Sequence, residues 1–275
     1  MSDDQRQKRC VNCDGQSFGL THEPREDFIL SQWSDLPLPY AILRSMFALY
    51  AIAIVFYSGL DGGHGEKIFI WMTYWVYYIF TTNFIVAAAN TWTYWLYGRR
   101  RKKLECLQSA WFSSSLKVQW VLHNLSGNGT FIATAMFWTV VYNGESVSFV
   151  TMNVHGISLV LVILDFTITR CPIRIHHFYL AAIFSSTYSL FTVVYWAAGG
   201  TNTVNEPFIY NVLDYSENPR MATAYLLSIT LIVVPLIHCL MYAIYRLRIY
   251  IHQNCCWPKK ETEPTLECEK ISIEL

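Results

Sequence analysis

Two side chains, Thr73 and His155, have the types needed for a nucleophile and its base. Thr73 lies six residues into an apolar stretch that starts at Lys67, and His155 lies four residues into one that starts at Thr151. If both stretches are helices entering a membrane from the same side, a rise of 1.5 Å per residue places the side chains roughly 9 and 6 Å deep. An imidazole at this depth can take the proton of a threonine hydroxyl and make it nucleophilic. The structural alternative is a threonine bonded to its own helix and a histidine linking two helices.

Other ionisable side chains fall inside or at the ends of apolar stretches, where they are costly and therefore informative. Arg44 is close to the start of its stretch, so its long side chain is expected to extend to the membrane surface. Five more are expected near the surface opposite Thr73: His123, Asp165, His176, His177 and His238. They predict either a metal or proton site or a network of hydrogen bonds and ion pairs at helix ends.

Six apolar stretches must position these residues, and each is about as long as a membrane crossing requires. They are Tyr40–Gly59, Lys67–Tyr94, Leu122–Tyr142, Thr151–Ile168, Phe178–Ala198 and Met221–Tyr245. The third is the weakest, because it opens on the polar run 123–129, whose first turns are expected to be irregular or packed within the protein. The fold class predicted is an all-α, polytopic membrane helix bundle: a tail at 1–38, a six-helix transmembrane domain at 39–248 and a second tail at 249–275.

Lys and Arg residues alternate between the segments that separate the apolar stretches. They gather before the first stretch, at Arg99–Lys103, at Arg170 and Arg174, and after the sixth, although the formal net charge is zero. Because basic residues remain on the cytosolic side, both termini are predicted to be cytosolic. Trp71, Trp75, Tyr195, Trp196 and Tyr210 are expected to form an aromatic belt at the outer face. The basic run is typical of contact with anionic membrane lipids and not with nucleic acid, and no cofactor is implied.

Cysteines and glycosylation sequons add smaller signals. Cys10 and Cys13 form a single CxxC, which is expected to be a reduced pair in the tail or, with further ligands, a metal site. The adjacent Cys255 and Cys256 follow the sixth stretch, where S-palmitoylation and two free thiols remain alternatives. The sequons at Asn124 and Asn128 lie in or below the third stretch and are predicted to be unused.

Five parts of the chain carry distinctive motifs: Met152–Ser158, Val162–Asp165, Pro172–Arg174 with His177, Tyr195–Asn202 and Ile209–Tyr215. Together these motifs resemble the rolling stone family. The resemblance runs from about the first apolar stretch to the sixth. It implies a multipass membrane protein of embryonic muscle precursors, needed for the fusion of myoblasts into muscle fibres.

That family is in turn distantly similar to the androgen-induced membrane hydrolases, which are described as cleaving fatty acid esters of hydroxy fatty acids with a Thr and a His. Thr73, in Ile70–Thr73, and His155, with Asp165 ten residues on, fall on the corresponding positions. The resemblance therefore implies catalytic roles for Thr73 and His155. This chain lacks the paired histidines of the hydrolases, and its loops differ from theirs in length.

Three functions compete on the sequence alone. The first is myoblast fusion at the plasma membrane through membrane protein partners, membrane lipids or membrane shape. The second is hydrolysis of lipid esters, and the third, which the residues favour least, is transport of ions or protons. The longest outer segment, Gly199–Arg220, is too short to build an adhesive interface of about 800 Å² per partner. This favours action within the bilayer over adhesion between cells.

Overall fold

The structure is a computed structural model that describes residues 18–60, 65–100, 102–144 and 146–256, apart from the side chains of Glu66, Cys255 and Cys256. The CxxC at Cys10 and Cys13 and the thiols of Cys255 and Cys256 lie outside what it describes. Within the described residues the chain is helical, and its only extended pairings are two isolated bridges formed by Ser31.

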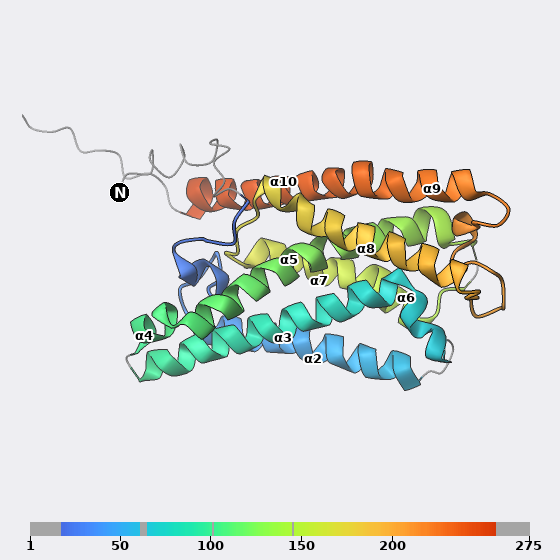
Figure 1. The fold of residues 1–275 in the computed structure, drawn as a ribbon. Helices are drawn as coiled ribbons and strands as arrows, with labels where there is room; N and C mark the ends of the chain where they lie inside the picture. Colours follow the sequence, from blue (N-terminus) through green and yellow to red (C-terminus); the bar gives the residue numbers. More distant parts are fainter. Residues whose placement is uncertain (1–17, 61–64, 101, 145, 257–275) are drawn as a thin grey trace, which may run out of the picture.

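Long helical rods run side by side along the molecule (Figure 1). The first two are α2 (Pro37–Leu60) and α3 (Met72–Arg99), and α5 (Ala110–Met136) continues into the π-helix η4 (Phe137–Val141). The next rod is made of α6 (Phe149–Met152), the π-helix η5 (Asn153–Ile157) and α7 (Ser158–Ile168), followed by α8 (Phe178–Ala197). The last is made of α9 (Pro219–Ser228), the π-helix η8 (Ile229–Val233) and α10 (Val234–Ile251), which runs on into η9 (His252–Cys256). Short helices complete the chain: η2 (Arg25–Phe28), η3 (Gly65–Ile70), α4 (Lys103–Gln108), η6 (Ile175–His177) and η7 (Asn211–Leu213).

Four of the rods are long and apolar enough to cross a membrane: Pro37–Leu60, Phe149–Ile168, Ile175–Ala197 and Pro219–Asn254. The chain is therefore an all-helical protein with four candidate membrane-spanning helices among the described residues. The second and third predicted spans correspond to α3 and α5, which are as long but more polar. Their polar side chains face inward, since Asn83, Asn90, Gln119, Asn124 and Asn128 are all buried.

Of the two alternatives for the opening of the third predicted span, the polar run 123–129 is packed within the protein and is not irregular. The helix α5 begins at Ala110, not Leu122, and it is regular through the polar run. Its interior side chains find partners close by, because the Asn124 amide donates to the Trp120 carbonyl and the Asn128 amide to the Asn124 carbonyl. Both sequon asparagines are buried in this helix, which leaves no room for a glycan.

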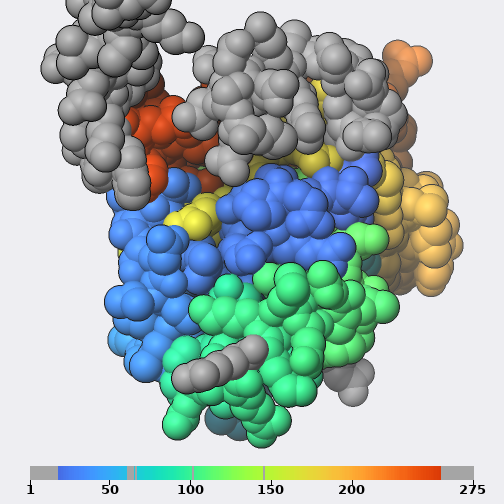
Figure 2. Space-filling model, turned by 90° about the vertical axis from the view of Figure 1, so that its left-hand side faces the viewer, coloured from blue at the N-terminus to red at the C-terminus, as the bar shows by residue number. Residues whose placement is uncertain are grey.

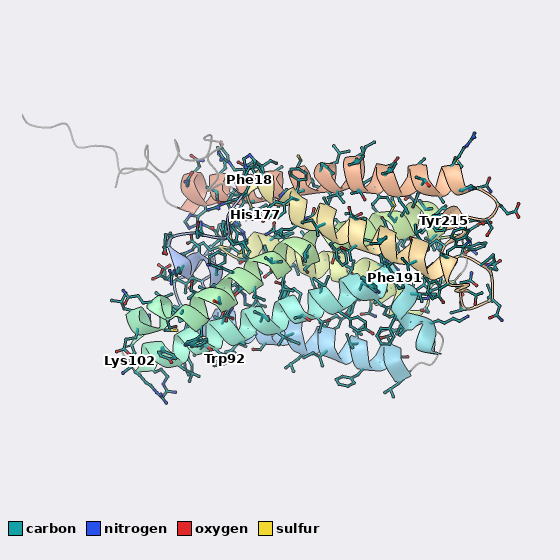
Figure 3. The ribbon with its side chains drawn as sticks, in the orientation of Figure 1. Phe18, Trp92, Lys102, His177, Phe191 and Tyr215 are labelled. Carbon is teal, nitrogen blue, oxygen red and sulfur yellow. The ribbon has the colours of Figure 1, made fainter. Side chains whose placement is uncertain are left out.

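The two ends of the bundle differ in charge. We call one end the basic end, because it carries Arg99, Arg100, Lys102, Lys103, Arg170, Arg174, Arg246 and Arg248. The other is the long-loop end, formed by segment 198–218, residues 142–144 and 146–148, and the first turns of α3 and α6. Figure 3 labels Lys102 and His177 at the basic end and Tyr215 at the long-loop end.

Residues 18–36 form a cap over the basic end. Figure 2, which looks onto this end, shows the cap (blue) across its centre. Phe28, Ile29 and Leu30 are buried, and the Phe28 carbonyl accepts hydrogen bonds from Arg44 and Gln119 inside the bundle. The cap thus closes the inner polar groups off from this side.

At the long-loop end, segment 198–218 is folded against the bundle. Lys67 donates from Nζ to Thr201 Oγ1 at 2.9 Å and to the Asn202 carbonyl at 2.5 Å. Leu213 and Tyr215 are buried against Ala222 of α9. The segment therefore holds Tyr210 in a defined place above the start of α3.

Candidate active site

Thr73 and His155 are in contact at the long-loop end. Thr73 lies in the first turn of α3 and His155 lies in η5. Thr73 Oγ1 is 3.5 Å from His155 Nε2, a distance at the long end of hydrogen bonding that catalytic pairs often show before a substrate binds. The structure thus brings together the two residues that the sequence singled out, and their catalytic roles stay a prediction.

His155 sits in the middle of a π-helical turn. Such turns carry an extra residue, change the direction of the side chains around them, and are frequent at functional sites. The turn is anchored by Asn153, whose side chain donates to the Phe149 carbonyl at 2.8 Å and accepts a short hydrogen bond from the Tyr50 hydroxyl of α2. These two hydrogen bonds of Asn153 explain how the π-helical turn is held in position inside the bundle.

The His155 ring is 6% exposed and is positioned mainly by aromatic side chains. Phe137, the first residue of η4, stacks on it with ring centroids 4.0 Å apart and planes 8° apart. The Trp138 indole donates to the His155 carbonyl at 3.0 Å. Nδ1 makes no well-formed hydrogen bond, and the backbone carbonyl of Ala133 is the acceptor beside the ring. A neutral imidazole with its proton on Nδ1 would present the Nε2 lone pair to Thr73.

Two tyrosine hydroxyls complete the site, and the sequence did not single them out for it. The backbone N–H of Met72, at the start of α3, donates to Tyr188 Oη at 3.0 Å and to Tyr210 Oη at 3.2 Å. Tyr188 comes from α8 and Tyr210 from the long loop. Tyr210 was placed in the aromatic belt, but its hydroxyl is turned to the start of α3. The sequence indicates the position of the Tyr210 hydroxyl only weakly, because segment 198–218 has no periodicity that shows which way a side chain points.

A shallow pocket of about 230 Å³ opens next to the site. Phe137, the residue stacked on His155, forms part of its wall, and Ser146, Ser148 and Thr151 add hydroxyl groups. Its mixed lining suits the polar part of an amphiphile whose chain lies along the helices. Phe137 stands between this pocket and the imidazole.

The other ionisable residues make a separate inner cluster near the basic end. Asp165 of α7 lies 3.4 Å from His123 of α5, measured between Oδ2 and Nδ1. His238 is placed between Asn128, at 3.1 Å, and the Arg174 carbonyl, at 2.8 Å. His177, which Figure 3 labels close to Phe18, contacts the Gly19 carbonyl of the cap. His176 packs on Phe18. These residues do not converge, and the described part of the chain holds no group of three potential metal ligands.

Arg44 does not extend to the membrane surface, so that expectation was wrong. It is 2% exposed, and its guanidinium donates to the Phe28 and Ala87 carbonyls and to the hydroxyls of Thr91 and Thr169. The cap and the 169–174 turn bring two of these acceptors to the side chain, and α3 supplies the other two, which the sequence could not reveal. Arg248 is buried in a similar way on the Phe166 and Cys171 carbonyls.

Comparison with known proteins adds a family to this geometry. A family model described as protein rolling stone matches residues 3–258. Protein rolling stone from Drosophila melanogaster is 24% identical over 240 residues, which cover 84% of this chain and 86% of that protein. No solved structure matches the chain. Since the family model spans nearly the whole sequence, the chain belongs to the protein rolling stone family.

Proposed function

We propose that this protein hydrolyses lipid esters within the membrane, with Thr73 as the nucleophile and His155 as its base. The contact between Thr73 Oγ1 and His155 Nε2, at 3.5 Å, carries the proposal. The π-helical turn and the stacked Phe137 support it, since they hold the imidazole in one orientation. The resemblance to membrane hydrolases that use a Thr and a His agrees with it.

The reaction follows from the two side chains and one water molecule. His155 Nε2 takes the Thr73 proton as Oγ1 bonds to the ester carbonyl carbon. The bond to the alkoxy oxygen then breaks, and the departing alcohol takes the proton from His155, which leaves an acyl-threonine. Water attacks this ester with His155 again as base, and Thr73 leaves with its proton restored. The products are one alcohol and one fatty acid.

The position of the pair indicates the kind of substrate. It lies at the long-loop end of the apolar rods and not in the middle of them, so it suits an ester bond close to a lipid's polar part. A long acyl chain would then extend along the apolar helices, and the pocket with Ser146, Ser148 and Thr151 would receive the polar side of the ester. Fatty acid esters of hydroxy fatty acids, the substrates of the similar hydrolases, have this shape.

A labelling experiment tests the proposal. Purified protein in detergent is treated with a long-chain fluorophosphonate probe, and turnover of a p-nitrophenyl long-chain ester is measured. Wild type and Thr73→Ser are both expected to react measurably, because both keep a hydroxyl group at position 73. Thr73→Ala and His155→Ala are expected to be inactive. Thr82→Ala is the matched control, because Thr82 is an exposed residue of the same helix bonded to the Tyr78 carbonyl. Equal labelling of wild type and Thr73→Ala would contradict the proposal.

We also propose that all six rods cross the plasma membrane with both termini in the cytosol. The support is the concentration of Lys and Arg at the basic end, which the positive-inside rule assigns to the cytosol. Epitope tags at either terminus are then expected to bind antibody only in permeabilised cells, and a tag between Thr201 and Glu206 in intact cells. Surface staining of a carboxyl-terminal tag would contradict this topology.

A second proposed function is myoblast fusion, supported by the family to which the chain belongs and by what the resemblance implies. The short segments at the long-loop end favour action on lipid or on neighbouring membrane proteins. Loss of the protein is expected to leave specified but mononucleate myoblasts, and normal multinucleate fibres would contradict this role. Expression of Thr73→Ala in such cells links the two functions, since rescue of fusion would separate fusion from hydrolysis.

A further inference from the structure

Three hydroxyl groups meet at the amino end of α3, and their hydrogens are not equally committed. Tyr188 Oη donates its only hydrogen to the Ile70 carbonyl at 2.8 Å, while it accepts from the Met72 N–H at 3.0 Å. Tyr188 is 3% exposed. Its hydroxyl is therefore occupied by the backbone that leads into α3, and it has no hydrogen left for another acceptor.

Tyr210 is in a different situation. Its hydroxyl oxygen accepts from the Met72 N–H at 3.2 Å, and the hydroxyls of Tyr188 and Thr73 are its side-chain neighbours. No carbonyl or carboxylate among the described residues accepts the Tyr210 hydrogen, so this hydrogen is not committed to the backbone. Burial raises the pKa of Tyr210 to about 12. The phenol therefore keeps its proton at neutral pH.

The ring of Tyr210 is also held in place. It packs edge-on against Trp71, with ring centroids 5.1 Å apart and planes 76° apart. Segment 198–218, which carries it, is tied to the bundle by Lys67. The hydroxyl is consequently presented to Thr73 before any substrate arrives, as preorganised donors in hydrolases are.

We infer that Tyr210 is the hydrogen-bond donor that stabilises the oxyanion when Thr73 attacks an ester. This inference rests on the proposed hydrolysis. When Thr73 Oγ1 bonds to the carbonyl carbon, the electron pair of the C=O bond moves to the carbonyl oxygen, which is then a near neighbour of Oγ1. Tyr210 turns its uncommitted hydrogen to this anion and keeps its proton throughout. Tyr188 and the Met72 N–H act as positioning groups for the Tyr210 hydroxyl.

The arrangement assigns a role to the long loop. The nucleophile comes from α3, the base from η5, and the oxyanion donor from segment 198–218. Three parts of the chain thus complete one site at the long-loop end.

Tyr210→Phe tests the inference, since it removes the hydroxyl and keeps the ring against Trp71. We expect kcat for a p-nitrophenyl long-chain ester to fall about 100-fold, with KM nearly unchanged, because losing one oxyanion donor costs about 10²- to 10³-fold. Inhibition by a long-chain trifluoromethyl ketone, which forms a tetrahedral adduct with the nucleophile, is expected to weaken by a similar factor. Tyr215→Phe is the matched control (Figure 3), because it removes a buried hydroxyl of the same segment that bonds Thr192 instead.

Each outcome decides the matter. If Tyr210→Phe keeps the wild-type kcat, the inference is overturned and the hydrolase proposal stays intact. The same holds if Tyr215→Phe loses as much kcat as Tyr210→Phe, because both losses would then reflect folding. If Tyr210→Phe yields little folded protein, the ratio of inhibitor Ki to substrate KM still applies, since it does not depend on the amount of active protein. An unchanged ratio overturns the inference. Absence of Thr73-dependent turnover in the wild type removes both the inference and the hydrolase proposal.

Discussion

Two polar regions are buried in this bundle, and they use their hydrogen-bonding groups differently. Near the basic end, Arg44 has four acceptors, Arg248 has two carbonyls, and Asp165 faces His123. Near the long-loop end, the polar contact between Thr73 and His155 is long, and the imidazole is held mainly by stacking on Phe137. Single atoms near the basic end, such as Arg44 Nε and His123 Nε2, lack a partner, but each of these buried charged groups has at least one polar partner. Buried polar groups with several partners hold a fold together, whereas those that are loosely paired are available to a substrate.

An apolar layer separates the two regions. Along α3, Phe80 and Phe84 lie between Thr73 and Thr91, and along the facing rod Val162 lies between His155 and Asp165. Gly127 of α5 allows Phe166 and Met241 to close this layer, because a Cβ there would lie 2.5 Å from a side-chain carbon of each. We call the region near the basic end the inner region and the region around Thr73 and His155 the outer region. With its several hydrogen bonds, the inner region is expected to act as a support.

The largest expected effect is on activity, at the outer region. Thr73→Ala and His155→Ala are each expected to lower kcat by about 10⁴-fold or more, and the double variant by no more than either single one, since nucleophile and base act as a unit. Melting temperatures in detergent should change little for Thr73→Ala, because its hydroxyl makes few strong contacts. Additive losses in the double variant, or a collapse of stability in Thr73→Ala, would assign the pair a structural role.

The next effect is on stability, at the inner region. Arg44→Met is expected to lower the free energy of unfolding by about 3–5 kcal/mol, because it strands buried acceptors and removes a charge near Asp165. Arg44→Lys should recover only part of this, since one ammonium group cannot reach the same acceptors. Thermal melts of both variants are compared with Arg246→Met, where an exposed arginine of α10 is lost. A melting curve for Arg44→Met that matches that of Arg246→Met would show that the inner cluster is not a support.

The smallest expected effect concerns the layer between the regions. Gly127→Ala should cost about 1–3 kcal/mol, because its methyl group would collide with Phe166 and Met241 and force them aside. Gly59→Ala is the control, since a Cβ at that exposed helical position meets nothing within 4 Å. The two glycines are compared by melting temperature. Equal stability of the two variants would mean that the layer is loosely packed and does not isolate the two regions.

The helical class and the similar depth of the two candidate residues could be predicted because they depend on order along the chain. Apolar stretches long enough to cross a bilayer must be helices, since the backbone has no other way to satisfy its hydrogen bonds there. Two helices entering from one side then put Thr73 and His155 at similar depth by the rise per residue alone. The rise per residue does not tell which side of each helix Thr73 and His155 lie on. For His155, the π-helical turn at Asn153–Ile157 helps to set this orientation.

What only the tertiary structure decided was which groups meet across elements far apart in sequence. Arg44 is at the end of an apolar stretch, where a long side chain ordinarily reaches water, but the cap and the 169–174 turn cover it and supply its acceptors. Tyr210 belongs to an irregular segment, and its hydroxyl reaches Met72 only because that segment folds back over α3. The sequence by itself determined the helices, the basic end and the pair Thr73–His155 as candidates. The partners of each buried polar group depended on packing between helices, because a hydrogen bond forms only where folding brings donor and acceptor within reach.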